Sequence, residues 1–183
     1  MKKLLILALA VGISTAAWGR EMAGVTMSDT VEIGDQTLVL NGMGLRKKAI
    51  IKVYVAGLYL TEKMDDATAI LAADTTRRTA MEFRFGVSAD KMCAAWKEGL
   101  ENNTDNPSAE LKAKFDTLCE YQADMDKGGM MVYTYVPGTG TEVSINDAVK
   151  GTIEGKDFAD ALFSCWIGPE PPGAAFKKGL LGL

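Results

Sequence analysis

The chain has 183 residues, of which 48% are hydrophobic, and its formal net charge is −4. Because nucleic acids and anionic membranes attract basic surfaces, this acidic balance argues against both kinds of partner, although local basic clusters stay possible. The chain contains no histidine, which excludes Ser-His-Asp and Cys-His catalysis and histidine metal sites, and no other spacing of residues predicts a metal or a cofactor.

The N-terminus is typical of a secretory signal peptide over residues 1–19. Two lysines precede the apolar run Leu4–Ile13 and a series of small residues, and the favoured cleavage point follows Gly19. The run is too short to span a bilayer, and no later segment has about 18 uninterrupted apolar residues. We expect an exported protein, periplasmic in a Gram-negative bacterium or secreted by a eukaryotic route, whose residues 20–183 form one domain without an integral membrane segment.

Strands are predicted for the first part of the mature chain, in short alternating segments over residues 24–28, 31–33 and 37–40. The pair Gly34-Asp35 is the clearest turn between them. The next stretch, Leu38–Leu60, runs from a basic cluster into a long strand-like segment that still carries Lys52 and Tyr54. Cations on an otherwise apolar strand need a physical reason.

If this stretch is extended, Arg46, Lys52 and Tyr54 lie on one face together with Lys48 and Ile50. That face mixes apolar surface with hydrogen-bond donors, as a cleft for a ligand with an oxygen-rich end and an apolar body requires. The plainer alternative is an exposed strand face with ordinary charge.

Helices and further strands are predicted for the rest of the chain. The expected helices cover about 66–72, 89–102 after the N-cap Ser88, 106–119 beginning at Asn106-Pro107, 157–167 and 174–181. The expected strands cover 78–85, 130–136 and 141–145, with a third strand of the meander ending at residue 153. Without regular βαβ alternation, this order predicts an α+β fold: an antiparallel sheet with helices packed on one face.

Three cysteines are an odd number for an exported protein, so at least one is unpaired or pairs between chains. Cys93 and Cys119 fall in successive predicted helices, and a disulfide between them could contribute about 3–4 kcal/mol on the chain-entropy model. Because the sequence gives no distance, pairing and its absence both stay open. Cys165 shares an apolar helix face with Leu162 and Trp166, which favours a small buried hydrophobe over a reactive thiol.

Three segments form an ordered set along the chain: Gly42–Arg46 with Lys52–Leu60, the helical Ala94–Lys97, and Phe158–Gly168 followed by Lys177–Leu180. This set resembles the chalcone isomerase family, in particular its bacterial chalcone-isomerase-like members and its fatty-acid-binding relatives. The likeness covers nearly the whole mature chain. It implies an open-faced β-sandwich with a cleft between the sheet and the helices.

The resemblance also implies which residues meet a ligand. Arg46 matches the arginine that meets the ligand's oxygens, and Tyr54 takes the place of a threonine of the plant enzymes. Lys91 stands where those enzymes have an asparagine, a tyrosine before it is missing, and Cys165 replaces a small polar residue. Because ring closure of a chalcone needs a polarised ketone and positioned proton transfer, we do not expect this chain to perform it.

The fatty-acid-binding relatives need only an arginine and a tyrosine hydroxyl for a carboxylate, and an apolar chamber for the tail. We therefore expect a non-catalytic binder of a small apolar ligand, such as a fatty acid, held by Arg46 and Tyr54. Tyr59, Lys52 and Cys165 are further candidate ligand-binding residues, although Tyr59 lies on the opposite strand face unless a bulge intervenes.

Several alternatives stay open beside this hypothesis. Arg46 could pair with a surface acid, and Tyr54 could be an ordinary core residue. The whole protein could instead be an isomerase or intramolecular lyase of the chalcone isomerase type, or a structural or protein-interaction module whose cleft is filled by its own side chains. The sequence does not give the oligomeric state.

Overall fold

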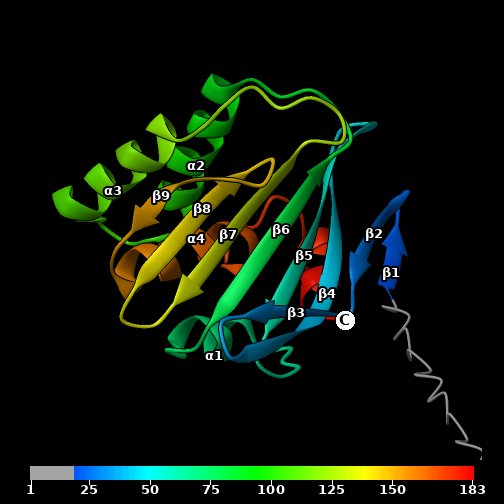
Figure 1. The fold of residues 1–183 in the computed structure, drawn as a ribbon. Helices are drawn as coiled ribbons and strands as arrows, with labels where there is room; N and C mark the ends of the chain where they lie inside the picture. The colour runs from blue at the N-terminus through cyan, green and yellow to red at the C-terminus, as the bar shows by residue number, and fades with distance from the viewer. Residues whose placement is uncertain (1–18) are drawn as a thin grey trace, which may run out of the picture.

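Seven antiparallel strands, each paired with the next along the chain, form the main sheet of the computed structural model, which describes residues 19–183 (Figure 1). They are β3 (Thr30–Ile33), β4 (Gln36–Lys48), β5 (Ile51–Leu60), β6 (Arg77–Phe83), β7 (Met130–Val136), β8 (Gly140–Ile145) and β9 (Ala148–Ile153). A separate two-stranded sheet holds β1 (Gly19–Met22) and β2 (Val25–Ser28). The predicted signal peptide lies outside the described residues except for Gly19.

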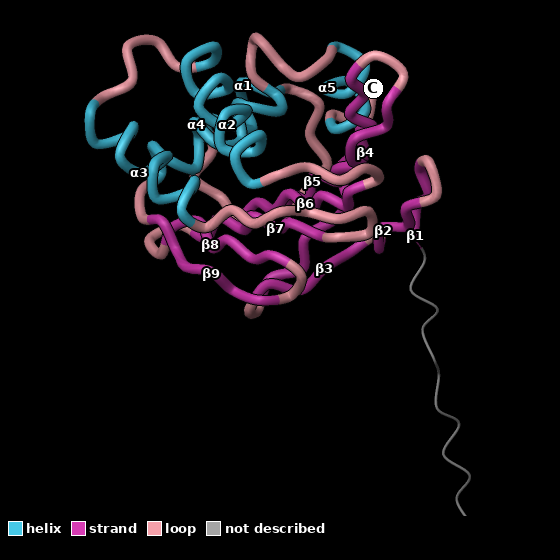
Figure 2. The backbone as a smooth tube through the Cα atoms, turned by 90° about the horizontal axis from the view of Figure 1, so that it is seen from above, coloured by secondary structure: helices cyan, strands magenta, loops and turns pink. Residues whose placement is uncertain are grey.

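The five helices of the described chain lie on one side of the main sheet (Figure 2). They are α1 (Ala67–Ala72), α2 (Ala89–Asn103), α3 (Ala109–Glu120), α4 (Lys156–Ile167) and α5 (Ala174–Leu180). The predicted α+β class is confirmed. Most residues of α4 are buried between the sheet and the other helices. None of the helices in residues 19–183 has the length and apolar character needed to cross a membrane.

The stretch Leu38–Leu60 is a hairpin, and the prediction of one long strand is wrong. The chain reverses after Lys48, where Ala49 has a φ of 53°, and returns as β5. Alanine rarely adopts this left-handed conformation. The turn also lacks the glycine, asparagine and proline that are typical of hairpin turns. The alternation of residue types therefore continues across the turn and hides it.

Glycines on β4 explain how α5 comes to lie against the sheet. A Cβ atom at Gly44 would sit 2.6 Å from the Phe176 carbonyl oxygen, closer than real Cβ contacts allow. Only the bare glycine backbone lets the helix approach this strand. The contact also holds the loop before α5, which includes Pro172, beside the β4–β5 hairpin.

The helix α3 begins at Ala109, two residues after Pro107, which is the predicted first helical residue after the cap Asn106. Ser108 is the N-cap, because its hydroxyl accepts a hydrogen bond from the Leu111 N–H at 3.1 Å. Asn106 has a φ of 48° and belongs to the preceding turn. Both Asn and Ser are good caps, so local preference did not decide between them.

Candidate functional site

A cavity of about 670 Å³ lies between the β4–β5 hairpin, α2 and the C-terminal end of α4. Its volume falls within the range of about 300–1,000 Å³ typical of small-molecule sites. Its apolar wall comes from both layers of the fold and includes Val53, Val87, Met92, Trp96 and Pro171. The cavity is thus the cleft between sheet and helices that the family resemblance implied.

Arg46 and Tyr54 both line this cavity, and they are directly opposite each other across β4 and β5. Opposite residues of an antiparallel pair project to the same face of the sheet, so their side chains are neighbours. Tyr54 is buried, with its ring 5.7 Å from the centroids of Phe83 and Phe176. The tyrosine therefore has a fixed position at the inner end of the cavity.

The guanidinium of Arg46 is half-buried and bonds only to backbone carbonyl oxygens among residues 19–183. It donates to the Lys47 oxygen at 2.7 Å and to the Pro172 oxygen. Within the described chain, no carboxylate lies at ion-pair distance from Arg46, so the alternative of a surface ion pair is not what the structure shows. A positive charge without a counter-ion beside an apolar cavity suits an anionic ligand group.

Trp166 is a cavity residue whose role the sequence did not reveal. Its side chain is 1% exposed, and its indole Nε1–H has no hydrogen-bond partner among the described residues. An unsatisfied buried donor costs about 1–3 kcal/mol. A ligand acceptor placed between Trp166 and Tyr54 would satisfy this N–H.

Burial governs the ionisation of the tyrosine and the thiol in the cavity. It raises the pKa of Tyr54, while the positive charge of Arg46 acts in the opposite direction. Burial also raises the pKa of the Cys165 thiol to about 12, and this thiol donates to the Ala161 oxygen at 3.3 Å. Both groups are therefore protonated at neutral pH and act as donors.

We expect the Cys165 thiol to be almost inert in the native protein. A pKa of about 12 leaves on the order of one thiolate in 10⁴ at pH 8, and the thiolate is the reactive species. A disulfide-exchange colour reagent should release about one equivalent only after denaturation, and Cys165→Ala should release none. Rapid release from the native protein at pH 8 would contradict the burial of this thiol.

Two predicted ligand-binding residues are not in the cavity. Tyr59 projects from the other face of the sheet, where its hydroxyl donates to the Ser28 oxygen at 3.0 Å and its ring packs with β2. Lys52 is exposed and is not part of the cavity wall. The pairing of β4 with β5 and its register shifts fix both positions, so neither residue lies in this cavity.

The remaining predicted residues have clear positions. Cys165 lines the cavity where α4 meets α2, and a Cβ atom at Gly99 would lie 2.7 Å from its sulfur. Cys93 of α2 forms a disulfide with Cys119 of α3, with their Cα atoms 4.9 Å apart. In residues 19–183, no three cysteine or carboxylate side chains gather where they could hold a metal ion.

Comparison with known proteins gives two findings. The pattern of the chalcone isomerase-like family matches residues 19–182. The solved structure of a fatty-acid binding protein from Arabidopsis thaliana is similar with a TM-score of 0.67 and 18% sequence identity, covering 90% of this chain and 96% of that protein. At this identity the likeness shows a shared fold. No curated protein matches the sequence.

Proposed function

The chain belongs to the chalcone isomerase-like family, and within that family we propose that it is a non-catalytic binder of a small apolar ligand with a carboxylate-like end, such as a fatty acid. One observation carries this proposal: the donors of Arg46, Tyr54 and Trp166 gather in a cavity with a largely apolar wall, and no carboxylate of the described chain pairs with Arg46. The fold shared with a fatty-acid binding protein supports it.

Each donor suits one carboxylate group in a different way. Arg46 supplies a planar fork that can contact two oxygens at once. Tyr54 supplies a neutral hydroxyl, since its raised pKa keeps the proton in place. Trp166 supplies an N–H that is already buried without a partner, so ligand binding does not add the cost of removing this group from water. The apolar wall receives the tail, because burial of a hydrocarbon contributes about 0.8 kcal/mol per CH₂ group.

The isomerase alternative has weaker support from this geometry. An intramolecular addition needs a group that removes or transfers a proton near pH 7. Tyr54 and Cys165 retain their protons because burial raises both pKa values. Glu98 and Glu170 line the cavity from exposed positions at its rim. The alternative predicts turnover of an enone that Arg46→Ala abolishes while the fold stays intact.

The structural-module alternative predicted a cleft filled by the protein's own side chains. The cavity of about 670 Å³ does not support that prediction. We place the binder outside the cytoplasm, in the periplasm or in a secretory route. The signal-like sequence of residues 1–19 and the Cys93–Cys119 disulfide support this location, because disulfides persist mainly in oxidising compartments.

We expect Arg46→Met to weaken oleate binding by about 10- to 100-fold, because a hydrogen bond to a charged group contributes about 1.5–3 kcal/mol. Oleyl alcohol has the same tail without the carboxylate, so its affinity should change little. Titration calorimetry, or displacement of a fluorescent fatty acid, measures both affinities.

A matched control is Arg84→Met, since Arg84 lies beside Gly24 and Glu82, outside the cavity wall. This variant should bind oleate like the unmodified protein. If Arg46→Met bound oleate as tightly as the control, the proposed head-group site would be wrong. Native mass spectrometry of the protein purified from its own compartment would show which ligand it carries.

A further inference from the structure

The tip of the β4–β5 hairpin carries apolar side chains in water. Ile50 is 95% exposed and Ile51 is 41% exposed, while Phe85, from the segment after β6, is 51% exposed. The Arg84 N–H donates to the Val53 oxygen at 2.8 Å, which brings Phe85 beside the start of β5. Three of the five large exposed hydrophobic side chains in residues 19–183 therefore gather at one place.

Lysines surround these apolar side chains. The segment from Arg46 to Lys52 reads RKKAIIK and contains no acidic residue. Lys47, Lys48 and Lys52 are exposed, and none forms an ion pair with a described residue. Lys47 and Lys52 are opposite each other in the hairpin, an arrangement of like charges that destabilises a strand pair. Although the net charge of the chain is −4, cations are concentrated at this site, where their mutual repulsion weakens the fold.

This tip forms one side of the cavity mouth. Lys48, Ile51 and Phe85 line the cavity and are themselves exposed, as is Lys91 near the start of α2. The acidic residues of the rim, Glu98 and Glu170, come from α2 and from the loop after α4, not from the hairpin. The apolar and cationic side chains are therefore next to the entrance for the ligand.

We propose that the hairpin tip, with Ile50, Ile51, Phe85 and the surrounding lysines, docks the cavity mouth onto an anionic lipid surface. Exposed lysines attract anionic head groups, and apolar side chains insert into the boundary between head groups and acyl chains. Docking in this orientation lets an apolar ligand pass between bilayer and cavity without crossing water. The surface binding itself does not depend on the ligand proposed above.

A protruding tip fits a bilayer better than an acidic protein partner. A stable protein interface buries about 800 Å² on each partner, and one two-residue turn with a neighbouring phenylalanine offers much less. A lipid surface needs no matching shape, only side chains that reach into it. Figure 1 shows the tip projecting past the body of the sheet, where a planar surface can reach it.

The test is sedimentation of the purified protein with vesicles of phosphatidylcholine and phosphatidylglycerol, compared with vesicles of phosphatidylcholine alone. We expect binding to the anionic vesicles that weakens as salt is added. The double variant K47Q/K52Q should bind about 10- to 30-fold more weakly, and Ile50→Ser about 10-fold more weakly. None of these three residues lines the cavity.

Matched controls are K112Q/K150Q and Val149→Ser, which change exposed residues on α3 and β9. These elements lie at the opposite side of the molecule from the hairpin (Figures 1 and 2), so vesicle binding should not change. Failure of the unmodified protein to bind anionic vesicles, equal losses in the controls, or capture of an acidic protein by the tip without vesicle binding would overturn the proposal. Arg46→Met should lose oleate affinity and keep vesicle binding, which separates this result from the ligand-binding test.

Discussion

Replacement of Arg77 by methionine will lower the free energy of unfolding by about 3 kcal/mol or more. Arg77 is fully buried on β6 beneath the helices. One guanidinium nitrogen donates to the Ile70, Leu71 and Ala73 oxygens at 2.9, 3.5 and 3.3 Å, and the other pairs with Asp160 of α4. Methionine fills most of the volume but supplies none of these donors.

The substitution will mainly destabilise α1, which has only six residues. Such a short helix is unstable alone, and the carbonyl groups of its last turn have no partner within the helix. Arg77 supplies their donors, together with Lys156, whose Nζ lies 3.0 Å from the Leu71 oxygen. The aromatic rings of Tyr135 and Phe163, 5.1 and 4.9 Å from the guanidinium carbon, lose a cation–π partner as well.

Asp160 limits the loss of stability that the Arg77 substitution causes. It is about one-third exposed and keeps an ion pair with Lys156 at 2.6 Å, so the mutation does not leave a buried charge without a partner. The effect is therefore due to the unsatisfied carbonyls of α1 rather than to Asp160. Amide hydrogen exchange should show faster opening of α1 than of the sheet.

Urea denaturation and thermal unfolding measure this prediction. For a chain of this size, a loss of about 3 kcal/mol lowers the melting temperature by about 6–12 °C. The control is Arg78→Met, the next residue on β6, which projects from the opposite face and is only partly buried. We expect it to change stability by less than about 1 kcal/mol. Equal, small effects of the two variants would show that the bonds of Arg77 to α1 contribute little.

Arg77 illustrates what strand periodicity does not reveal. The alternation of Met81, Phe83 and Phe85 with Glu82 and Arg84 predicts one dry face for a strand that reaches residue 85. Met81 and Phe83 lie on such a face, but β6 ends at Phe83 and Phe85 is exposed. Arg77 lies on that same dry face. Its burial is possible because a short helix presents free carbonyls to it, and a sequence does not specify which segments meet in three dimensions.

The prediction that Arg46 and Tyr54 share a face is confirmed, but the structure corrects the reason for it. An even separation in one extended strand puts two side chains on the same face. The real chain turns at Ala49, yet the hairpin pairs Arg46 with Tyr54 and so returns them to one face. Lys52 leaves the cavity wall for a different reason: a register shift follows the Arg46–Tyr54 pair, so that Lys52 pairs with Lys47 and faces the other way. Site residues were thus partly predictable from residue types, whereas their register was not.

Local signals predicted those elements that local chemistry controls. The hairpin of β7 and β8 turns at the glycine-rich segment after Val136, and α2 begins after Ser88, both as expected. No local sequence signal indicates the unsatisfied indole N–H of Trp166, since its lack of a partner depends on the positions of all its neighbours. A tryptophan on an apolar helix face predicts burial, but not which hydrogen bonds it lacks.

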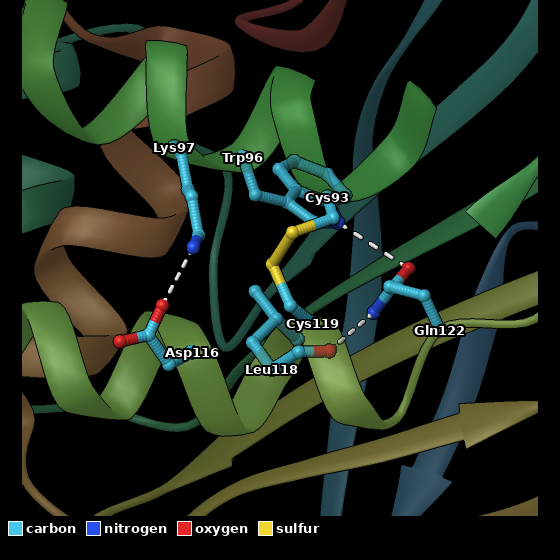
Figure 3. The surroundings of a disulfide bond; sticks show 7 residues. All are labelled: Cys93, Trp96, Lys97, Asp116, Leu118, Cys119 and Gln122. Atoms are coloured by element: carbon cyan, nitrogen blue, oxygen red, sulfur yellow. Dashed lines mark hydrogen bonds and ion pairs between the residues drawn. A yellow bond between two sulfur atoms is a disulfide. The ribbon is translucent and has the colours of Figure 1, made fainter. Parts of the chain in front are cut away.

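Removal of the disulfide with C93A/C119A will lower the free energy of unfolding by about 3–4 kcal/mol, since the bridge joins two residues that are 26 positions apart in the sequence. The bridge acts chiefly on the unfolded chain. In the folded state, the ion pair of Lys97 with Asp116 at 2.6 Å still joins α2 to α3 (Figure 3). The cavity wall formed by α2 should therefore keep its position.

The variant should bind oleate with unchanged affinity well below its melting temperature, although it unfolds at a lower urea concentration. Trp96 supports this expectation, because it lines the cavity and is held by Trp166 and Tyr133, with ring centroids 5.3 and 5.6 Å away. Reductant should destabilise the unmodified protein to the level of the variant and leave the variant itself unaffected. Cys165→Ala serves as control, since it should keep the sensitivity to reductant. A loss of oleate affinity in C93A/C119A would instead mean that the bridge fixes the cavity wall in the folded state, not only the ensemble of unfolded chains.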